Sequence, residues 1–279
     1  MNKLLTTFFS KNQLDKLTKT ELNLINYASN YPEEFYKCSI KQLANKVDIS
    51  MSVISKLVKK LNFDSLKDMQ FFVYHNFLNT DIKNTENIDY QKIILKQLFL
   101  FYRESISKTS HLIDLNQINR AINSILDSER IYLYGAGSSY LSASELGINL
   151  AKIGINAIAF RDFHSLLLTS SQKDIKNKLV ILFSKSCDTK EIKFAIELFV
   201  LYKIKFWLIT ANKQIKNKLD NVILYSTLEQ NRRFVSISSK INQQFIADLL
   251  FLFIQRNKVS DFEAKYAENI KVLEFWNKK

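Results

Sequence analysis

The stretch "IYLYGAGSSYL" (residues 131–141) places two of the chain's four glycines, Gly135 and Gly137, directly after a run of apolar and aromatic residues. Glycine is so rare in these 279 residues that each one is expected to mark a position where a Cβ would not fit, such as a tight turn or a close approach to a ligand. Ser138 and Ser139 come next and open a helical pattern. The stretch therefore predicts a buried strand, a tight turn and the start of a helix.

Five short apolar runs, rich in β-branched and aromatic residues, alternate with helical patterns from residue 130 onward. Strands that are apolar on both faces and separated by helices are typical of a parallel sheet covered on both sides. We therefore predict a doubly wound α/β domain for the C-terminal part of the chain. The runs are "RIYLYG" (130–135), "INAIAF" (155–160), "KLVILFS" (178–184), "IKFWLI" (204–209) and "NVILYS" (221–226).

Hydroxyl side chains also follow the third apolar run, where Ser184, Ser186 and Thr189 precede another helical pattern in "SKSCDTKE" (184–191). The carboxyl ends of parallel strands form the edge at which ligands bind, and a helix N-terminus attracts anions. Two hydroxyl-rich helix starts on neighbouring strand ends would enclose a phosphate-sized anion, and Gly137 would let the backbone approach it closely. The loops thus favour a sugar-phosphate site, although such hydroxyls could instead simply cap the helices, at about 1 kcal/mol each.

Residues 18–78 have the pattern of a compact helical unit. Two capping boxes, "TKTE" (18–21) and "SIKQ" (39–42), each precede a helical run of apolar residues. Only "DIS" (48–50) separates the second helical pattern from a third. Two short amphipathic helices joined by so tight a turn have the sequence form of a helix-turn-helix. Asp48 would take the left-handed conformation there, which Asp accepts better than most residues.

The solvent side of the third helix carries short polar side chains followed by lysines, and no acidic residue occurs from residue 50 to residue 62. A recognition helix presents its N-terminal residues to base edges and its flanking cations to phosphates. The pattern therefore favours double-stranded DNA as a partner. A solvated helix face remains the alternative, since the formal net charge of +13 partly reflects a lysine-rich composition. The candidate DNA contacts are Ser50, Ser52, Ser55, Lys56, Lys59 and Lys60.

The segment "NTDIKNTENI" (79–88) is polar and aperiodic, and we predict a linker there. The predicted domains are residues 1–78, a helix-turn-helix domain, and residues 89–279, the α/β domain.

Cys38 and Cys187 lie far apart without ligand-type spacing around them, so neither a disulfide nor a metal site is predicted, and no cofactor is expected. No apolar run is long enough to span a bilayer, and the N-terminus lacks a secretory pattern. We therefore expect a cytoplasmic protein without a membrane partner.

The order and spacing of these motifs resemble those of the RpiR-type (MurR/RpiR family) transcriptional regulators, which have an N-terminal helix-turn-helix and a C-terminal sugar isomerase (SIS) domain. The resemblance covers roughly residues 1 to 257 and rests on "SIKQLANKVDISMSVISKLVKKLNF", "YGAGSSYLSASELGINLAKIG" and "SKSCDTKE". It implies a five-stranded flavodoxin-like sheet, operator DNA as partner, a phosphorylated sugar as effector, and a homodimer or homotetramer. It also implies ligand contacts at Ser138, Ser139, Ser184, Ser186 and Thr189.

The second loop departs from the family's usual S-x-S-G-E-T, because Cys187 replaces the glycine and Asp188 the glutamate. A Cβ at residue 187 could block the backbone approach that glycine permits. Lys185 could contact a phosphate directly, or it could fill the anion site itself. Further along, Arg232 or Arg233 could approach a ligand or a neighbouring subunit.

The sequence leaves two other functions open. SIS domains also occur in sugar-phosphate isomerases and lyases, whose chemistry needs a carboxylate or imidazole next to the substrate carbonyl. Glu145 and His164 are the candidates, although each also has an ordinary explanation as a surface group. An enzyme would not need the helix-turn-helix, so regulation is favoured. The other alternative is a sugar-phosphate sensor that does not bind DNA, since the third helix lacks Arg and Gln, the usual base readers.

Overall fold

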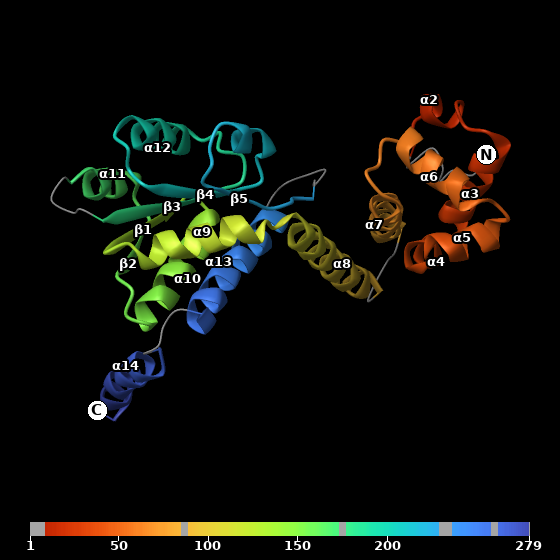
Figure 1. The fold of residues 1–279 in the computed structure, drawn as a ribbon. Coiled ribbons are helices and arrows are strands. Elements are labelled where there is room, and N and C mark those ends of the chain that lie inside the picture. The colour runs from red at the N-terminus through yellow and green to blue at the C-terminus, as the bar shows by residue number, and fades with distance from the viewer. Residues whose placement is uncertain (1–8, 85–88, 173–176, 229–235, 258–261, 279) are drawn as a thin grey trace. The chain divides into compact units, whose positions relative to one another are not determined.

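The computed structural model divides into two compact units, Met1–Leu100 and Phe101–Lys279 (Figure 1). Each unit has its own hydrophobic core. Within the described part of the chain, no helix combines the length and the apolar character that crossing a membrane requires. The structure describes residues 9–84, 89–172, 177–228, 236–257 and 262–278.

The first unit is all-α. Both predicted capping boxes are present, at Thr18 with Glu21 and at Ser39 with Gln42, and each starts a helix of the unit. Asp48 ends the second of these helices in the left-handed conformation, with φ 54° and ψ 54°, as predicted. The helices are α2 (Lys11–Leu14), α3 (Lys19–Asn30), α4 (Pro32–Lys37), α5 (Ile40–Val47), α6 (Met51–Lys60), α7 (Leu66–Asn84) and the first half of α8 (Asp89–Leu112).

The pair α5 and α6 forms the predicted helix-turn-helix. Leu43 of α5 packs into the same core as Ile54 and Leu57 of α6, and none of these three side chains is exposed. Their 3.6-residue spacing puts the apolar positions of each helix on one face. The opposite face of α6 therefore points to solvent.

The boundary between the units differs from the predicted linker at 79–88. Residues 79–84 are the last residues of α7, and residues 85–88 lie outside the described part. The units divide later, inside α8, because Leu100 is buried against aromatic and apolar side chains of α4 and α7. The polar stretch at 79–84 contains neither Gly nor Pro, so nothing in it stops a helix.

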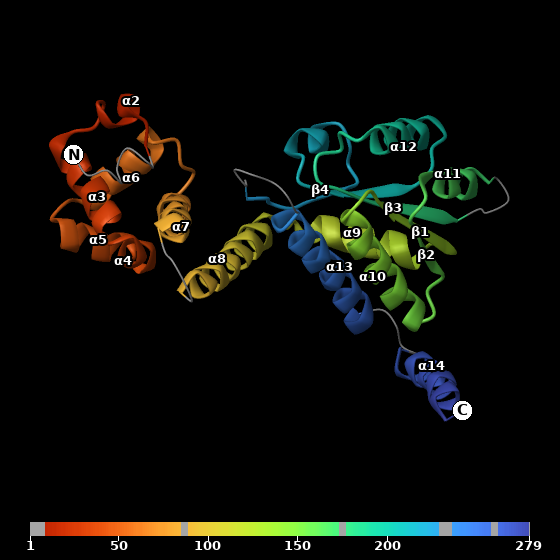
Figure 2. The ribbon, with the colours of Figure 1, turned by 180° about the vertical axis from the view of Figure 1, so that it is seen from behind.

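The second unit is a parallel five-stranded sheet with the order β2-β1-β3-β4-β5, which confirms the predicted flavodoxin-like fold. Figures 1 and 2 show α9, α10 and α13 on one face of the sheet and α11 and α12 on the other. Its elements after α8 are α9 (Leu115–Leu126), β1 (Arg130–Gly135), α10 (Ser139–Lys152), β2 (Ala157–Phe160), α11 (Phe163–Ser171), β3 (Lys178–Ser184), α12 (Lys190–Leu201), β4 (Phe206–Thr210), η1 (Lys213–Asn217), β5 (Val222–Leu224), α13 (Ser238–Asn257) and α14 (Phe262–Asn277).

Alternating side chains of the strands build a core on each face of the sheet. Ile131 and Leu133 of β1 pack with α9, α10 and α13, whereas Tyr132 and Tyr134 pack with α11 and α12. Successive residues of a strand point to opposite faces, so a strand covered on both sides must be apolar throughout.

A buried polar cluster fastens the second half of α8 to this domain. The Asn242 side-chain amide of α13 donates to Ser105 Oγ of α8 at 2.6 Å and to the carbonyl of Ser226, just after β5, at 2.7 Å. The hydroxyl oxygens of Ser105 and Ser238 are also 2.6 Å apart. Asn242 therefore joins α8, the end of β5 and the start of α13.

We predict that Asn242→Ala lowers the free energy of unfolding of the second unit by about 2 kcal/mol, because buried polar groups of this cluster lose their partner. Both tryptophans, Trp207 and Trp276, belong to this unit, so tryptophan fluorescence during urea denaturation of the full chain reports on it. Gln244→Ala is the control, since the bond of Gln244 within the described part of the chain is to Asp248, on the exposed side of the same helix. Equal effects of the two variants would contradict the role of the cluster.

Candidate functional site

The exposed face of α6 brings together most of the residues predicted to contact DNA. Ser50 caps the helix with its side chain, and Ser55 donates to a backbone carbonyl one turn earlier. Ser52, Lys56 and Lys59 are exposed, and neither lysine forms an ion pair with any residue that the structure describes. The two lysines are therefore available to a polyanion.

Lys60 lies in a different environment. Its Nζ is 2.8 Å from Glu21 Oε2, and the nearly buried Glu21 carboxylate also accepts the backbone N–H of Thr18 at 2.7 Å. Burial raises the pKa of Glu21, but the hydrogen bonds from Lys60 and Thr18 outweigh this effect and hold that pKa below its usual 4.5. Lys60 thus ties α6 to the capping box of α3, and its charge is already compensated within the protein.

The first loop of the α/β domain is shaped by its two glycines. A Cβ on Gly135 would lie 2.6 Å from the carbonyl carbon of Ser139, so α10 can begin this close to the end of β1 only beside glycine. Gly137 has a φ of +59°, a conformation that side chains rarely adopt. Ser138 is the N-cap residue of α10 but forms no side-chain cap bond.

The second loop is organised by its own serines. Ser184 Oγ accepts the N–H of Cys187 at 3.1 Å, and Ser186 Oγ accepts the N–H of Asp188 at 3.3 Å. Thr189 is the N-cap residue of α12, yet it also forms no side-chain cap bond. The explanation of these hydroxyls as helix caps therefore fails at Ser138 and at Thr189.

The two uncapped helices begin side by side at the carboxyl edge of the sheet. Gly135 of β1 pairs with Phe183 of β3, so both loops leave adjacent strands at the point where the strand order reverses. The helices α3, α5, α6, α9 and α11 all have side-chain caps. Ser138 and Thr189 lie instead where doubly wound folds bind ligands, with their hydroxyls uncommitted to the described residues.

Cys187, which replaces the family's glycine, adopts the left-handed conformation that glycine would favour, with a φ of 62°. Its side chain is buried in the core on the α11 and α12 face, and its Sγ lies 3.2 Å from Thr210 Oγ1. Burial raises the pKa of this thiol. The Cβ thus occupies the core and not the exposed side of the loop. Arg232 and Arg233 lie outside the described residues.

The sequence did not single out Thr210 and Asn212, which hold the second loop from the end of β4. Thr210 Oγ1 donates to the carbonyl of Lys185 at 3.0 Å, and Asn212 Nδ2 donates to the carbonyl of Ser186 at 2.8 Å. The sequence feature that could have identified them is their position: they are polar residues at the end of the apolar run that forms β4, and β4 pairs with β3.

The two groups considered for catalysis lie on the surface. Glu145 is exposed on α10 and accepts a hydrogen bond from Asn149 at 3.1 Å, and His164 is exposed in the first turn of α11. A base that abstracts a proton next to a carbonyl must be held over the substrate. In the described part of the chain, no group of three or more His, Cys, Asp or Glu side chains could hold a metal ion.

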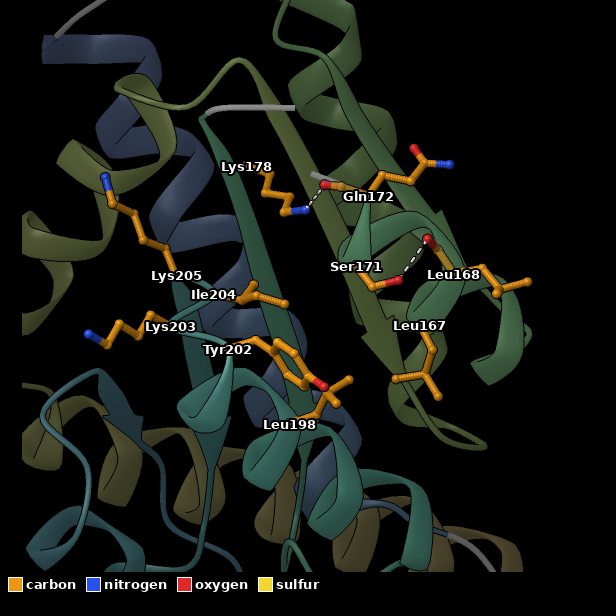
Figure 3. Close-up of a pocket in the computed structure, with 10 residues that line it drawn as sticks. All are labelled: Leu167, Leu168, Ser171, Gln172, Lys178, Leu198, Tyr202, Lys203, Ile204 and Lys205. Carbon is orange, nitrogen blue, oxygen red and sulfur yellow. Dashed lines mark hydrogen bonds between the residues drawn. The ribbon is translucent and has the colours of Figure 1, made fainter. Parts of the chain in front are cut away.

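A cavity of about 600 Å³ lies at the other edge of the sheet, between α11 and α12 (Figure 3). Its walls are largely apolar, and the Lys178 ammonium donates to the backbone carbonyl of Gln172. Lys178 starts β3 and Lys205 precedes β4, so the cavity lies near the amino ends of the strands. It is therefore distinct from the two loops. The lining residues are Leu167, Leu168, Ser171, Gln172, Lys178, Leu198, Tyr202, Lys203, Ile204 and Lys205.

Comparison with known families assigns both domains. Residues 8–79 match the helix-turn-helix domain of the rpiR family, and residues 124–253 match the SIS domain. The chain has the domain organisation of the RpiR type. The assignment agrees with the motifs from which the resemblance was inferred and with the observed fold.

The similar proteins align with this chain over most of their length. An uncharacterized HTH-type transcriptional regulator of Clostridium perfringens is 24% identical over 254 residues, 88% of this chain and 90% of that protein. The HTH-type transcriptional regulator RpiR of Escherichia coli is 19% identical over 244 residues, 86% of this chain and 82% of that protein. The solved structure of the Vibrio vulnificus NanR protein complexed with ManNAc-6P has a similar fold, with a TM-score of 0.59 and 18% identity over 97% of this chain and 98% of that one.

We predict that Lys60→Gln destabilises the first unit by about 1 kcal/mol, because it leaves Glu21 without its ion-pair partner while solvent screens part of the loss. Lys56→Gln and Lys59→Gln, which break no ion pair with the residues that the structure describes, should change stability by less than about 0.5 kcal/mol. During urea denaturation, far-UV circular dichroism reports the unfolding of both units, whereas tryptophan fluorescence reports only that of the second. A transition seen by circular dichroism alone therefore belongs to the first unit.

The effect of Lys60→Gln should depend on pH. The pKa of Glu21 is lower in the folded state than its usual 4.5, so the ion pair stabilises the protein above that pH and loses its contribution as pH falls through the folded pKa. The difference between wild type and variant should therefore shrink in acid. A constant difference would show that the Glu21 charge does not matter.

Proposed function

We propose that this chain is a DNA-binding transcriptional regulator of sugar or amino-sugar metabolism whose SIS domain senses a phosphorylated sugar. The observation that carries the proposal is the pair of uncapped helices at the carboxyl edge, α10 and α12, whose Ser138 and Thr189 hydroxyls form no bond with the described residues. A phosphate group is an acceptor that hydroxyls and helix N-termini bind well. A sugar phosphate would place this group between the two loops.

The exposed face of α6 supports the DNA-binding half of the proposal. Lys56 and Lys59 lie on the solvent side of the second helix of the helix-turn-helix, beyond the short polar residues at its start. This is the arrangement in which the first residues contact bases and the later cations contact phosphates. The relatives of similar length are named as HTH-type transcriptional regulators, which agrees with this role.

The NanR structure supports the proposed class of ligand, since that protein of similar fold is complexed with ManNAc-6P. We propose contacts to such a ligand from the two loops, and they fall into two groups. The first comprises the side-chain hydroxyls that form no bond with the described residues, at Ser138, Ser139 and Thr189. The second comprises Gly137, Ser184, Lys185 and Ser186, which shape the loops and present their backbone and hydroxyl groups.

We further propose a cytoplasmic homodimer that binds a two-fold symmetric operator, because one recognition helix reads too few base pairs. The faces of α10 and α13 expose large apolar side chains at Leu141, Ile148 and Leu252, which a second copy would cover. An isomerase or lyase is the less favoured function, since Glu145 and His164 are exposed and lie on different helices.

We predict that the purified chain binds the DNA upstream of its own gene in the presence of excess nonspecific competitor. Lys56→Gln with Lys59→Gln should weaken binding and reduce the slope of log K against log salt by about two per bound protomer, because each lysine releases roughly one counterion. Fluorescence anisotropy measures both quantities. Lys203→Gln with Lys205→Gln removes the same charge from the second unit and serves as the control.

A DNA reader loses affinity only with the α6 lysines. Equal losses in the two pairs of variants would show that net charge alone attracts DNA. Binding that disappears in competitor would favour a sugar-phosphate sensor that does not bind DNA.

We predict that ManNAc-6P, used as a probe of the ligand class, raises the melting temperature and changes DNA affinity, whereas ManNAc does neither. Replacing both N-cap hydroxyls, Ser138→Ala with Thr189→Val, should raise the dissociation constant by about tenfold or more for each hydrogen bond lost to the phosphate. The matched control, Ser138→Thr with Thr189→Ser, retains both hydroxyls. Isothermal titration calorimetry gives the constants, and unchanged affinity in the first pair would place the ligand elsewhere.

A further inference from the structure

We propose that Thr210 and Asn212 are positioning residues that hold the second loop in the conformation that binds the phosphate. The proposal rests on the function proposed above. Both residues lie at the end of β4, outside the loop, and neither has to touch the ligand.

Thr210 is fully buried, and its hydroxyl is the centre of the contact between β4 and the loop. Oγ1 donates to the carbonyl of Lys185 at 3.0 Å and accepts the N–H of Asn212 at 3.1 Å. It also lies 3.2 Å from the Sγ of Cys187. The same Lys185 carbonyl accepts the N–H of Ala211 at 3.0 Å. One buried hydroxyl thus contacts the first and third of three consecutive loop residues.

Asn212 holds the residue between them. Its Nδ2 donates to the carbonyl of Ser186 at 2.8 Å, while its Oδ1 accepts the N–H of Gln214 and caps η1. The nitrogen and the oxygen of the side-chain amide therefore bond two different segments. One end fixes the loop and the other fixes the short helix after β4.

These bonds turn the loop carbonyls toward β4. In a trans peptide the N–H points away from the C=O of the same unit. The carbonyl of Lys185 is directed at Thr210, so the N–H of Ser186 faces away from β4. A loop that binds an anion has to present N–H groups and turn its carbonyl oxygens aside, because these would repel the anion.

Hydrogen bonds within the loop also fix the orientation of its serine hydroxyls. Ser184 Oγ accepts from Cys187, and Ser186 Oγ accepts from Asp188. A hydroxyl that accepts in this way retains its O–H as a donor. The Ser184 hydroxyl also forms a side-chain hydrogen bond with Cys187, whereas the Ser186 O–H has no acceptor among the described residues. A phosphate oxygen supplies that acceptor.

The conformation of Cys187 explains why such an anchor is needed. A left-handed residue other than glycine costs about 1–2 kcal/mol and persists only where its surroundings enforce it. Here Cys187 follows two carbonyls fixed by β4, and its side chain is held against Thr210. Thr210 therefore does for this loop what a glycine at residue 187 would do without help.

Two pairs of variants test the proposal. Thr210→Val keeps the shape of the side chain and loses the hydroxyl, whereas Thr210→Ser keeps the hydroxyl. Asn212→Asp keeps the acceptor that caps η1 and loses the donor to Ser186, so it remains informative if Thr210→Val fails to fold. Asn212→Ala removes both and shows the contribution of the cap.

Two measurements on the full chain separate loop geometry from ligand binding. Hydrogen exchange of the amides of residues 186–188 without ligand reports loop order. Calorimetry with ManNAc-6P, inorganic phosphate and ManNAc reports binding. We expect faster exchange at these amides in Thr210→Val and Asn212→Asp, about tenfold weaker binding of ManNAc-6P, and near wild-type values in Thr210→Ser.

The outcomes distinguish this proposal from the proposed function. Wild-type exchange and wild-type affinity in both Thr210→Val and Asn212→Asp would overturn the positioning role. Wild type could bind no sugar phosphate while amide exchange at residues 186–188 is faster in Thr210→Val but not in Thr210→Ser. In that case the ligand assignment fails and the positioning role stands. Equal loss of affinity in Thr210→Val and Thr210→Ser would assign the effect to general destabilisation and would also overturn the proposal.

Discussion

The close approach between the end of β1 and the start of α10 is the constraint on which the α/β domain depends. At residue 135 a Cβ would collide with the backbone of Ser139, and glycine has none. Helix α10 can therefore begin directly at the strand end and run back across the sheet. That direction buries Ala143, Leu146 and Leu150 in the core that α9 and α13 complete. The same turn leaves Ser138 at the carboxyl edge, next to the loop that follows β3. Core packing and the candidate ligand site thus share one backbone turn.

Residues of one chemical type have different roles according to what surrounds them. Ser39 and Ser50 cap helices in the first unit, whereas Ser138 stands at an N-cap position and leaves its helix uncapped. Lys56 and Lys60 are four residues apart on α6, yet only Lys60 reaches the carboxylate of Glu21. A buried carboxylate must be paired or hydrogen-bonded. Lys60 therefore stabilises the fold by pairing with Glu21, and its charge is less available to DNA than that of Lys56.

Much of this architecture could be predicted from short-range patterns. The capping boxes, the left-handed Asp48 and the five strands depend on residues within one or two turns of each other, where propensity and periodicity act. The helix over residues 79–84, inside the predicted linker at 79–88, was not predicted for the opposite reason. The end of α7 has no apolar periodicity that marks it as helix, and the division of the units depends on the burial of Leu100 against α4 and α7, far away in the sequence.

The sequence by itself determined the two kinds of domain, the sheet type and the two loops at its edge, because glycine, serine and apolar residues encode local backbone geometry. Only the tertiary structure decided which hydroxyls stay free, which lysine is neutralised, and that Thr210 and Asn212 reach across from β4 to Lys185 and Ser186. The physical reason is that a hydrogen bond or ion pair needs its two partners within about 3 Å of each other. When those partners lie 25 to 40 positions apart, only the folded chain shows which groups meet.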